Sequence, residues 1–270
     1  MIHLVTALPA EARPLVRHFG LGGRQAGAPY PLYRNNAMML IVSGPGKVNA
    51  AAACAWLQTV DSGHAHSAWL NIGIAGHASL ATGTGVVAHR ITDTATGKSW
   101  YPPRLPGQPV PGSCLRTVER PELRYRDDTL YDMEAAGFYP SACCCTTAEL
   151  VQSFKVVSDN PAHPAAGITA KYCERLIGDQ LATINTLTEI LQSLQGKYAA
   201  WHAPHPDLDR LAQQWHFTVT QRHQLAALLK RWHALTQQPL MLDALYRQRQ
   251  AAGVLRLLEQ QINAMPVALA

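Results

Sequence analysis

The 270-residue sequence contains no apolar run of the roughly 18–20 residues that a membrane-spanning helix needs. The N-terminus, Met1 to Val5, lacks the basic flank, long apolar stretch and small-residue cleavage site of a signal peptide, and it is typical of a first strand. Internal repeats and low-complexity segments are also absent. Because 47% of the residues are hydrophobic, the chain can build a substantial core, and we expect a globular cytoplasmic protein.

Metal-binding patterns are scarce as well. None of the six cysteines forms a C-x-x-C pair, and Cys143, Cys144 and Cys145 are consecutive, so their side chains cannot easily converge on one ion. His202 and His205 lie three residues apart, but the prolines beside them predict an extended linker rather than a helical ligand pair. We therefore expect reduced, mostly buried cysteines, no metal and no cofactor.

The net charge of +5 is unevenly distributed along the chain. Residues 1–190 carry 15 Lys and Arg against 14 Asp and Glu, whereas residues 191–270 carry 8 against 4. A nearly neutral first part is suited to small molecules. The basic residues of the second part are scattered rather than clustered, which favours a solvated helix face over a nucleic-acid-binding surface.

Apolar stretches of strand length alternate with helical stretches over the first two thirds of the chain. The Ala-rich segment 47–60 predicts a helix, the proline-rich segment 97–113 predicts a loop, and 168–194 predicts a long amphipathic helix. The strands that we expect are 2–8, 37–42, 68–74, 85–92, 114–118 and 153–158. This alternation predicts an α/β fold, a three-layer αβα domain with a central mixed sheet.

The composition changes near Gly196, beyond which Gln, Leu and His dominate and strand patterns disappear. We therefore divide the chain into an α/β domain over residues 1–195 and a helical extension over residues 196–270. Amphipathic patterns predict three short helices in the extension: 207–215, one that begins near Thr220, and 242–262. They would form a small bundle or arms that pack on the main domain.

Four polar segments follow predicted strands, which is where ligands bind in open α/β sheets. Each has an ordinary structural explanation: Glu11 as an acid in a first helical turn, 43–50 as a tight turn, Asp132 as a helix cap, and 158–160 as turn chemistry. Glu134 is harder to explain in this way, because an apolar stretch surrounds it. The glycines of 43–50 would also let the backbone approach a ligand, and the following helix N-terminus favours anions.

Together and in this order, these segments and Asn71-Ile72-Gly73-Ile74-Ala75-Gly76 resemble the purine nucleoside phosphorylase superfamily. Within it the sequence is most similar to the methylthioadenosine/S-adenosylhomocysteine nucleosidases. The resemblance covers roughly residues 1–190. Its most specific elements are the Gly-Pro-Gly-Lys-x-Asn-Ala turn, the Met-Glu-Ala segment and the strand that ends in Ser-Asp.

The resemblance implies a role for each matching residue. Glu134 would accept hydrogen bonds from the ribose hydroxyls, and Met133 would pack on the sugar. Asp159, oriented by Ser158, would protonate a ring nitrogen of the departing purine, and Glu11 would position or deprotonate the attacking water. Carboxylates near the sugar would stabilise the positive charge of an oxocarbenium-like transition state.

Further positions follow from the same resemblance. It places Gly73, Ile74 and Val118 against the substrate, and it places Lys155 and Gly46 where they can contact an anion. Residues 117–121 are similar to the loop that covers the base in the family.

The sequence also departs from the family pattern. Ile74 stands where a hydroxyl residue is usual, and Asn71 stands where hexameric phosphorylases hold phosphate with an arginine, as in the nucleosidases. Lys155 falls where the nucleosidases often have an arginine. The segment 119–131 is too short for the strand and helix that relatives carry there, and Pro140 should end or kink a helix that runs longer in relatives. An altered substrate pocket is therefore expected.

The favoured interpretation is an enzyme that cleaves the N-glycosidic bond of a purine nucleoside, with water as the acceptor because Asn71 replaces the phosphate-binding arginine. A phosphorylase with phosphate as co-substrate is the near alternative. An alternative of another class is a non-catalytic nucleoside-binding subunit whose helical tail docks a partner protein. The resemblance also implies a homo-oligomer, with a dimer favoured, and we expect neither a membrane nor a nucleic acid as partner.

Overall fold

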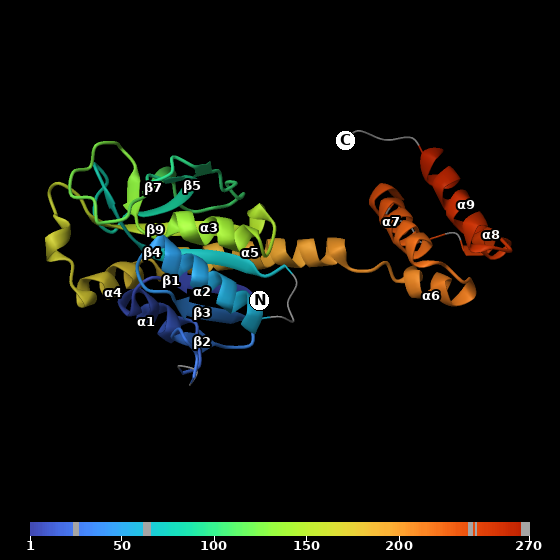
Figure 1. The fold of residues 1–270 in the computed structure, drawn as a ribbon, viewed down its shortest axis with the longest axis horizontal. Coiled ribbons are helices and arrows are strands. Elements are labelled where there is room, and N and C mark those ends of the chain that lie inside the picture. The colour runs from blue at the N-terminus through green and yellow to red at the C-terminus, as the bar shows by residue number, and fades with distance from the viewer. Residues whose placement is uncertain (24–26, 62–65, 237–239, 241, 266–270) are drawn as a thin grey trace. The chain divides into compact units, whose positions relative to one another are not determined.

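The computed structural model describes residues 1–23, 27–61, 66–236, 240 and 242–265. The chain forms two compact units, Met1–Ala199 and Ala200–Ala270, which are described separately (Figure 1). The boundary that we expect after residue 195 falls inside a helix, α5 (Leu181–His202). Among the described residues, no helix combines the length and apolar character that crossing a membrane requires.

The first unit is built on a nine-stranded mixed sheet, counted over the described residues. Strand β1 pairs in parallel with β3 and β4, and β4 pairs in parallel with β9, so the carboxyl ends of these four strands point the same way. The strands are β1 (Ile2–Thr6), β2 (Leu32–Arg34), β3 (Met38–Val42), β4 (Ala68–His77), β5 (Gly85–Asp93), β6 (Ser99–Trp100), β7 (Gly112–Thr117), β8 (Leu130–Asp132) and β9 (Val151–Asp159).

Part of the sheet closes on itself. Strand β9 pairs with β4 on one side and, antiparallel, with β5 on the other. Because β5 also pairs with β7, β7 with β8 and β8 with β4, these five strands form a closed ring. The ring brings β8 and β9 to the same end of β4, although about 20 residues separate them in the sequence, 130–132 from 151–159.

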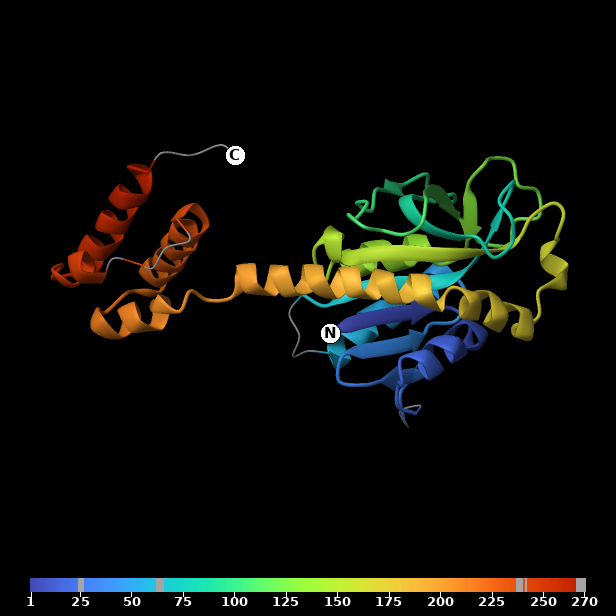
Figure 2. The same cartoon turned by 180° about the vertical axis from the view of Figure 1, so that it is seen from behind.

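Helices cover both faces of the sheet, as a three-layer αβα fold requires. Helices α2 and α3 lie in front of the sheet in Figure 1, and α5 lies in front of it in the reverse view of Figure 2. The helices of this unit are α1 (Pro9–His18), α2 (Lys47–Val60), α3 (Ala135–Cys143), α4 (Ala170–Asp179) and α5, with short 3₁₀ turns at Ala148–Leu150 and Ala165–Gly167. The predicted fold class is confirmed.

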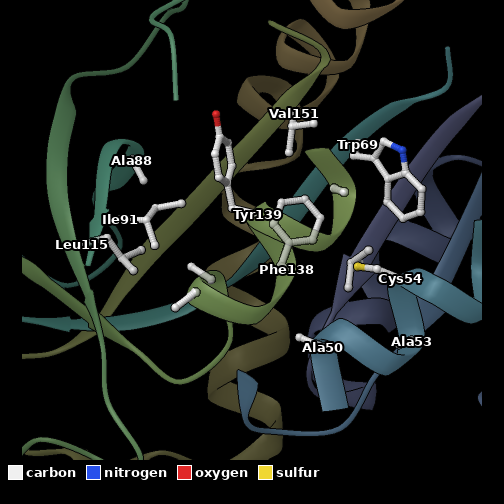
Figure 3. Close-up of a cluster of buried hydrophobic side chains, with 14 of the residues drawn as sticks. Ala50, Ala53, Cys54, Trp69, Ala88, Ile91, Leu115, Phe138, Tyr139 and Val151 are labelled. Atoms are coloured by element: carbon white, nitrogen blue, oxygen red, sulfur yellow. The ribbon is translucent and has the colours of Figure 1, made fainter. Parts of the chain in front are cut away.

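Each face of the sheet has its own apolar core. On one face α2 and α3 pack together, with Ala50, Ala53 and Cys54 of α2 beside Phe138 of α3 and Trp69 of β4 (Figure 3). The other core joins the sheet to α1, α4 and α5 through buried leucines and isoleucines, among them Leu15, Ile177, Ile184 and Leu187. Small side chains on α2 allow α3 to approach closely. This contact positions the carboxylate of Glu134, which lies at the start of α3.

Several local predictions need correction. The predicted helix over 168–194 is two helices, because the chain turns at Gln180, whose side-chain amide donates to the carbonyl of Gly83 at 2.8 Å. Pro140 does not end its helix, since α3 continues to Cys143. Strand β6 and the start of β7 lie inside the predicted loop 97–113. The short strands β2 and β8 were not predicted.

The second unit contains four helices among its described residues. They are α6 (Asp207–Gln214), α7 (Val219–Thr236), α8 (Leu242–Tyr246) and α9 (Ala251–Asn263). Trp215, Leu229, Trp232 and Leu258 belong to a core that this unit builds on its own. The indole N–H of Trp215 donates to the carbonyl of Gln248 at 3.0 Å, which ties the end of α6 to the connection between α8 and α9. The predicted third helix is therefore two helices, α8 and α9.

Candidate functional site

A cavity of about 260 Å³ opens at the carboxyl ends of β1, β4 and β9. Parallel strands end at the same edge of a sheet, so polar residues that follow different strands meet there. The short strand β8 and the start of α3 close one side of this cavity. The described residues that line it are Ala7, Leu8, Glu11, Pro45, Ile74, Ala75, Gly76, Pro121, Glu122, Tyr131, Asp132, Met133, Glu134, Ser158, Asp159, Ala165 and Ile168.

Glu11 is held in the first turn of α1 by three backbone donors. Its Oε2 accepts hydrogen bonds from the N–H groups of Ala7 at 2.9 Å and Leu8 at 2.8 Å. Its Oε1 accepts from the N–H of Ile74 on β4 at 3.0 Å. Glu11 therefore caps its own helix, as the ordinary structural explanation expects, and it also bridges to a strand. Position 74 contributes its backbone to this bridge, whatever its side chain.

Glu134 lies at the N-terminus of α3 and is 7% exposed. Its Oε1 accepts a hydrogen bond from the N–H of Gly46 at 2.9 Å. Gly46 adopts a φ of +101°, a left-handed conformation that favours glycine, in the turn that presents its N–H to the carboxylate. The glycine turn before α2 therefore orients a carboxylate that lies 88 residues further along the chain.

A buried ion pair lies behind these two glutamates. Nζ of Lys155 on β9 is 2.9 Å from Oδ2 of Asp132, and the side chains are 1% and 0% exposed. Asp132 also accepts hydrogen bonds from the hydroxyl of Thr117 at 2.7 Å and the N–H of Ala135 at 2.9 Å. A Cβ added at Gly73 would lie 2.9 Å from Oε1 of Glu11 and 3.3 Å from Nζ of Lys155, so glycine leaves these groups their space.

Asp159 ends β9 at the other end of the cavity. Its Oδ1 accepts a hydrogen bond from the hydroxyl of Ser158. Its Oδ2 accepts one from the phenol of Tyr125, a residue of the irregular segment before β8. Both carboxylate oxygens therefore have donors, and Asp159 is buried, with 6% of its surface exposed.

The cavity is strongly acidic. Five of its described lining residues are carboxylic acids, namely Glu11, Glu122, Asp132, Glu134 and Asp159, and none of the described lining residues is Lys, Arg or His. Burial raises the pKa of Glu11, against the opposing effects of Lys155 and the three backbone donors. Burial disfavours the Lys155 ammonium, but the surrounding carboxylates, Asp132 foremost, leave the pKa of Lys155 above its ordinary value. The lysine therefore stays charged.

The pKa of Glu134 predicts how the stability of the protein depends on pH. Burial, opposed by Lys155 and assisted by Asp132, raises the pKa of Glu134 from 4.5 to about 7. Between these values the folded protein keeps a proton that the unfolded chain releases, so the free energy of unfolding falls as the pH rises from 4.5 to about 7. At about 1.36 kcal/mol for each pKa unit, the Glu134 contribution amounts to at most ~3 kcal/mol.

Urea unfolding of the wild type and of Glu134→Gln at pH 5 and at pH 7 measures this contribution. Glutamine keeps an acceptor for the Gly46 N–H and cannot titrate. We expect the wild type to lose more free energy of unfolding between the two pH values than Glu134→Gln loses. Equal losses in the two proteins would show that Glu134 does not carry the raised pKa.

The residues predicted from the sequence lie together to a large extent. Six of them line the cavity: Glu11, Ile74, Met133, Glu134, Ser158 and Asp159. Gly73, Gly46 and Lys155 lie directly behind it, through the contacts with Glu11, Glu134 and Asp132 described above. Val118 is not among the described lining residues, and its N–H donates to the carbonyl of Asp132 at 2.8 Å. The roles of these residues stay predictions.

Sequence reasoning missed several residues of the site. Asp132 was interpreted only as a cap, and it does accept from the N–H of Ala135, but it also holds Lys155. Glu122 and Tyr125 come from an irregular stretch without a period that would mark them, and Tyr131 lies in the short strand β8, which was not predicted. The resemblance of 117–121 to a loop that covers the base was the one signal in this stretch, and Pro121 does line the cavity.

Within the described part of the chain, no group of three or more His, Cys, Asp or Glu side chains has the geometry to hold a metal ion. The acidic side chains of the cavity instead face hydrogen-bond donors and one buried ammonium. This arrangement is suited to proton transfer and to stabilising positive charge.

The comparisons with known proteins agree with this geometry at the level of the fold. The sequence matches no protein-family model and no curated protein. Among solved structures, it is similar to a 5′-methylthioadenosine/S-adenosylhomocysteine nucleosidase from S. pneumoniae, with a TM-score of 0.54 and 20% identity over 72% of this chain and 99% of that chain. The Arabidopsis thaliana 5′-methylthioadenosine nucleosidase gives a TM-score of 0.57 and 18% identity over 72% of this chain and 96% of that chain.

A third similar structure has a different named activity. The futalosine hydrolase of Helicobacter pylori matches with a TM-score of 0.52 and 12% identity, covering 70% of this chain and 97% of that chain. All three matches span nearly the whole of the other chain and 70–72% of this one, so the similarity extends over their whole fold and this protein has additional residues. The fold expected from the sequence motifs is therefore the fold that the comparisons find.

Proposed function

We propose that this protein, which has the fold of the methylthioadenosine/S-adenosylhomocysteine nucleosidases, cleaves the N-glycosidic bond of a purine nucleoside with water as the acceptor. The observation that carries the proposal is the convergence of Glu11, Glu134 and Asp159 on one cavity from the ends of three different elements. Cleavage of a glycosidic bond requires an acid at the leaving group and carboxylates near the sugar and the water.

In the proposed reaction the bond between C1′ and the ring nitrogen breaks, and its electron pair passes to the base. Asp159 gives a proton to the base, and the sugar develops the positive charge of an oxocarbenium ion, which the nearby carboxylates stabilise. A water oxygen bonds to C1′, and Glu11 accepts a proton from that water. Glu134 accepts hydrogen bonds from the ribose hydroxyls. The products are the free base and the free sugar.

The charge of the cavity supports water over phosphate as the acceptor. A phosphate beside C1′ would lie among carboxylates, which repel it. None of the described lining residues is a Lys, Arg or His that could pair with its negative charge. Lys155 is 1% exposed and already paired with Asp132, so its ammonium is engaged behind the cavity wall. Asn71, which stands where the phosphate-binding arginine is expected, donates to the carbonyl of Val5 at 3.1 Å and accepts from the hydroxyl of Ser153 at 3.0 Å.

Base release from a panel of nucleosides tests the proposal. The panel contains methylthioadenosine, S-adenosylhomocysteine, futalosine, adenosine and inosine, each with and without phosphate. We expect release of the base from at least one of them without phosphate, at a rate that phosphate does not increase. Release only with phosphate would make the protein a phosphorylase and would overturn water as the acceptor.

A non-catalytic nucleoside-binding subunit is the candidate of another class. The side chain of Ile74 and the short 119–131 segment favour it, as does the second unit, which builds its own core and would dock a partner protein. The presence of all three carboxylates favours an enzyme, because binding alone would not require them. Turnover by the wild type that is lost in Glu134→Ala eliminates the binding subunit. A cytoplasmic location and a homo-oligomer, with a dimer favoured, stay predictions.

A further inference from the structure

Ion pairs and hydrogen bonds fasten the segment 119–129, between β7 and β8, over the acidic cavity. Its Pro121 and Glu122 line the cavity directly. Its two ends are anchored by side chains of other elements. The contacts are Lys47 with Glu119, Arg116 with Asp127 at 2.6 Å, the Ser79 hydroxyl with Asp128, and the Asp127 N–H with the Tyr131 hydroxyl at 3.3 Å. Most of these groups are exposed, so each contact contributes little to holding the segment in place.

Tyr125 is the residue by which this segment contacts Asp159, although it is not itself among the described lining residues of the cavity. Its phenol donates to Oδ2 of Asp159, the oxygen that the Ser158 hydroxyl leaves open. The edge of its ring lies on Gly76: a Cβ added there would be 2.7 Å from Cε1 of Tyr125 and 2.7 Å from Oδ2 of Asp159. The edge of the Tyr125 ring and its hydroxyl thus lie against a residue without a side chain, and the hydroxyl is on the carboxylate.

A purine that receives a proton from Asp159 must bring a ring nitrogen to one of its two carboxylate oxygens. Ser158 and Tyr125 already donate to these two oxygens, and Tyr125 comes from a segment that can be displaced without moving β9. Tyr125 and the base therefore compete for one place. The cavity of about 260 Å³ that remains beside Tyr125 lies just below the ~300–1,000 Å³ that is typical of small-molecule sites.

We propose that Tyr125 acts as an internal substitute for the base, so that the segment 119–129 must release Asp159 before a purine can bind productively. The inference rests on the proposed function and adds to it a residue that sets apparent affinity. A ligand that binds only the open conformation has an apparent dissociation constant that rises as the open fraction falls. Weakening the Tyr125 contact therefore tightens binding of the base without adding any contact to it.

Calorimetric titration with adenine, an unreactive free base, tests the proposal on the full-length chain. The variants are Tyr125→Phe, which removes only the hydroxyl, and Tyr125→Ala, which also clears the ring. The control is Tyr101→Phe, because Tyr101 is 69% exposed and lies outside the cavity lining. We expect the dissociation constant to fall about tenfold in Tyr125→Phe and at least as far in Tyr125→Ala, since a hydrogen bond to a carboxylate no longer competes.

Kinetic measurements distinguish a Tyr125 that competes with the base from a Tyr125 that assists the reaction. With a nucleoside that the enzyme cleaves, we expect KM to fall in Tyr125→Phe while kcat changes little. A lower kcat, or adenine binding that is unchanged or weaker in both variants, would overturn the internal substitute and leave the nucleosidase proposal standing. If neither the wild type nor any variant binds adenine or releases a base, the proposed function and the role of Tyr125 fall together.

Discussion

Asp159→Asn is expected to lower the rate of base release by about 10²–10⁴-fold, the usual contribution of a general acid. Asparagine has nearly the same shape and keeps an acceptor for the hydroxyl of Ser158, but it has no proton to give to the leaving base. The site would retain Glu11 and Glu134, so the sugar and the water would still be positioned. The effect should therefore appear in kcat rather than in KM, and single-turnover kinetics with a saturating nucleoside would measure it.

Asp179→Asn is the matched control for this variant. Asp179 is the last residue of α4, is exposed, and does not line the cavity. The same chemical change at this position should leave base release at the wild-type rate. A fully active Asp159→Asn enzyme would show that protonation of the base comes from another group. Glu122, an acid of the cavity lining to which the proposed reaction gives no role, would be tested next.

Gly137→Ala is expected to lower the free energy of unfolding by about 3 kcal/mol or more, at the upper end of the range for overpacked cores. A Cβ at this position would lie 1.8 Å from the carbonyl oxygen of Lys47 and 2.5 Å from its carbonyl carbon. These are backbone atoms of α2, so no flexible side chain can move aside. The two helices would have to separate, which would also weaken the apolar core between them shown in Figure 3.

Urea unfolding measures the loss, with Gly196→Ala as the control. Gly196 lies within α5, where an added Cβ meets no atom within 4 Å, and alanine there should stabilise the helix by up to about 1 kcal/mol. A Gly137→Ala protein that still folds should bind nucleoside more weakly, because separation of α2 from α3 moves the N–H of Gly46 away from Glu134. Wild-type stability of Gly137→Ala would show that the helices tolerate a wider spacing.

Much of the fold was predictable from the local pattern of apolar and helix-forming residues in the sequence. The Ala-rich helix over 47–60 has the predicted bounds, and the apolar runs near residues 2, 38, 68, 85 and 153 are strands. Each of these elements is encoded by neighbouring residues, through helix propensity or through continuous apolar stretches that a sheet covered on both faces requires. The errors arose where distant contacts decide the outcome, as at Gln180, whose bond to the carbonyl of Gly83 accompanies the division of a periodic stretch into α4 and α5.

The sequence by itself determined the kind of domain and the identity of most carboxylates in the cavity, because these acids lie at the end of a strand or at the start of a helix. Only the tertiary structure decided how these groups are used. The ring of strands brings Asp132 of β8 to Lys155 of β9, and the close packing of α2 on α3 brings Gly46 to Glu134. Tyr125 reaches Asp159 from a segment without any regular pattern. Such contacts join residues that are far apart in the chain, so strand pairing and helix packing determine them and local propensity does not.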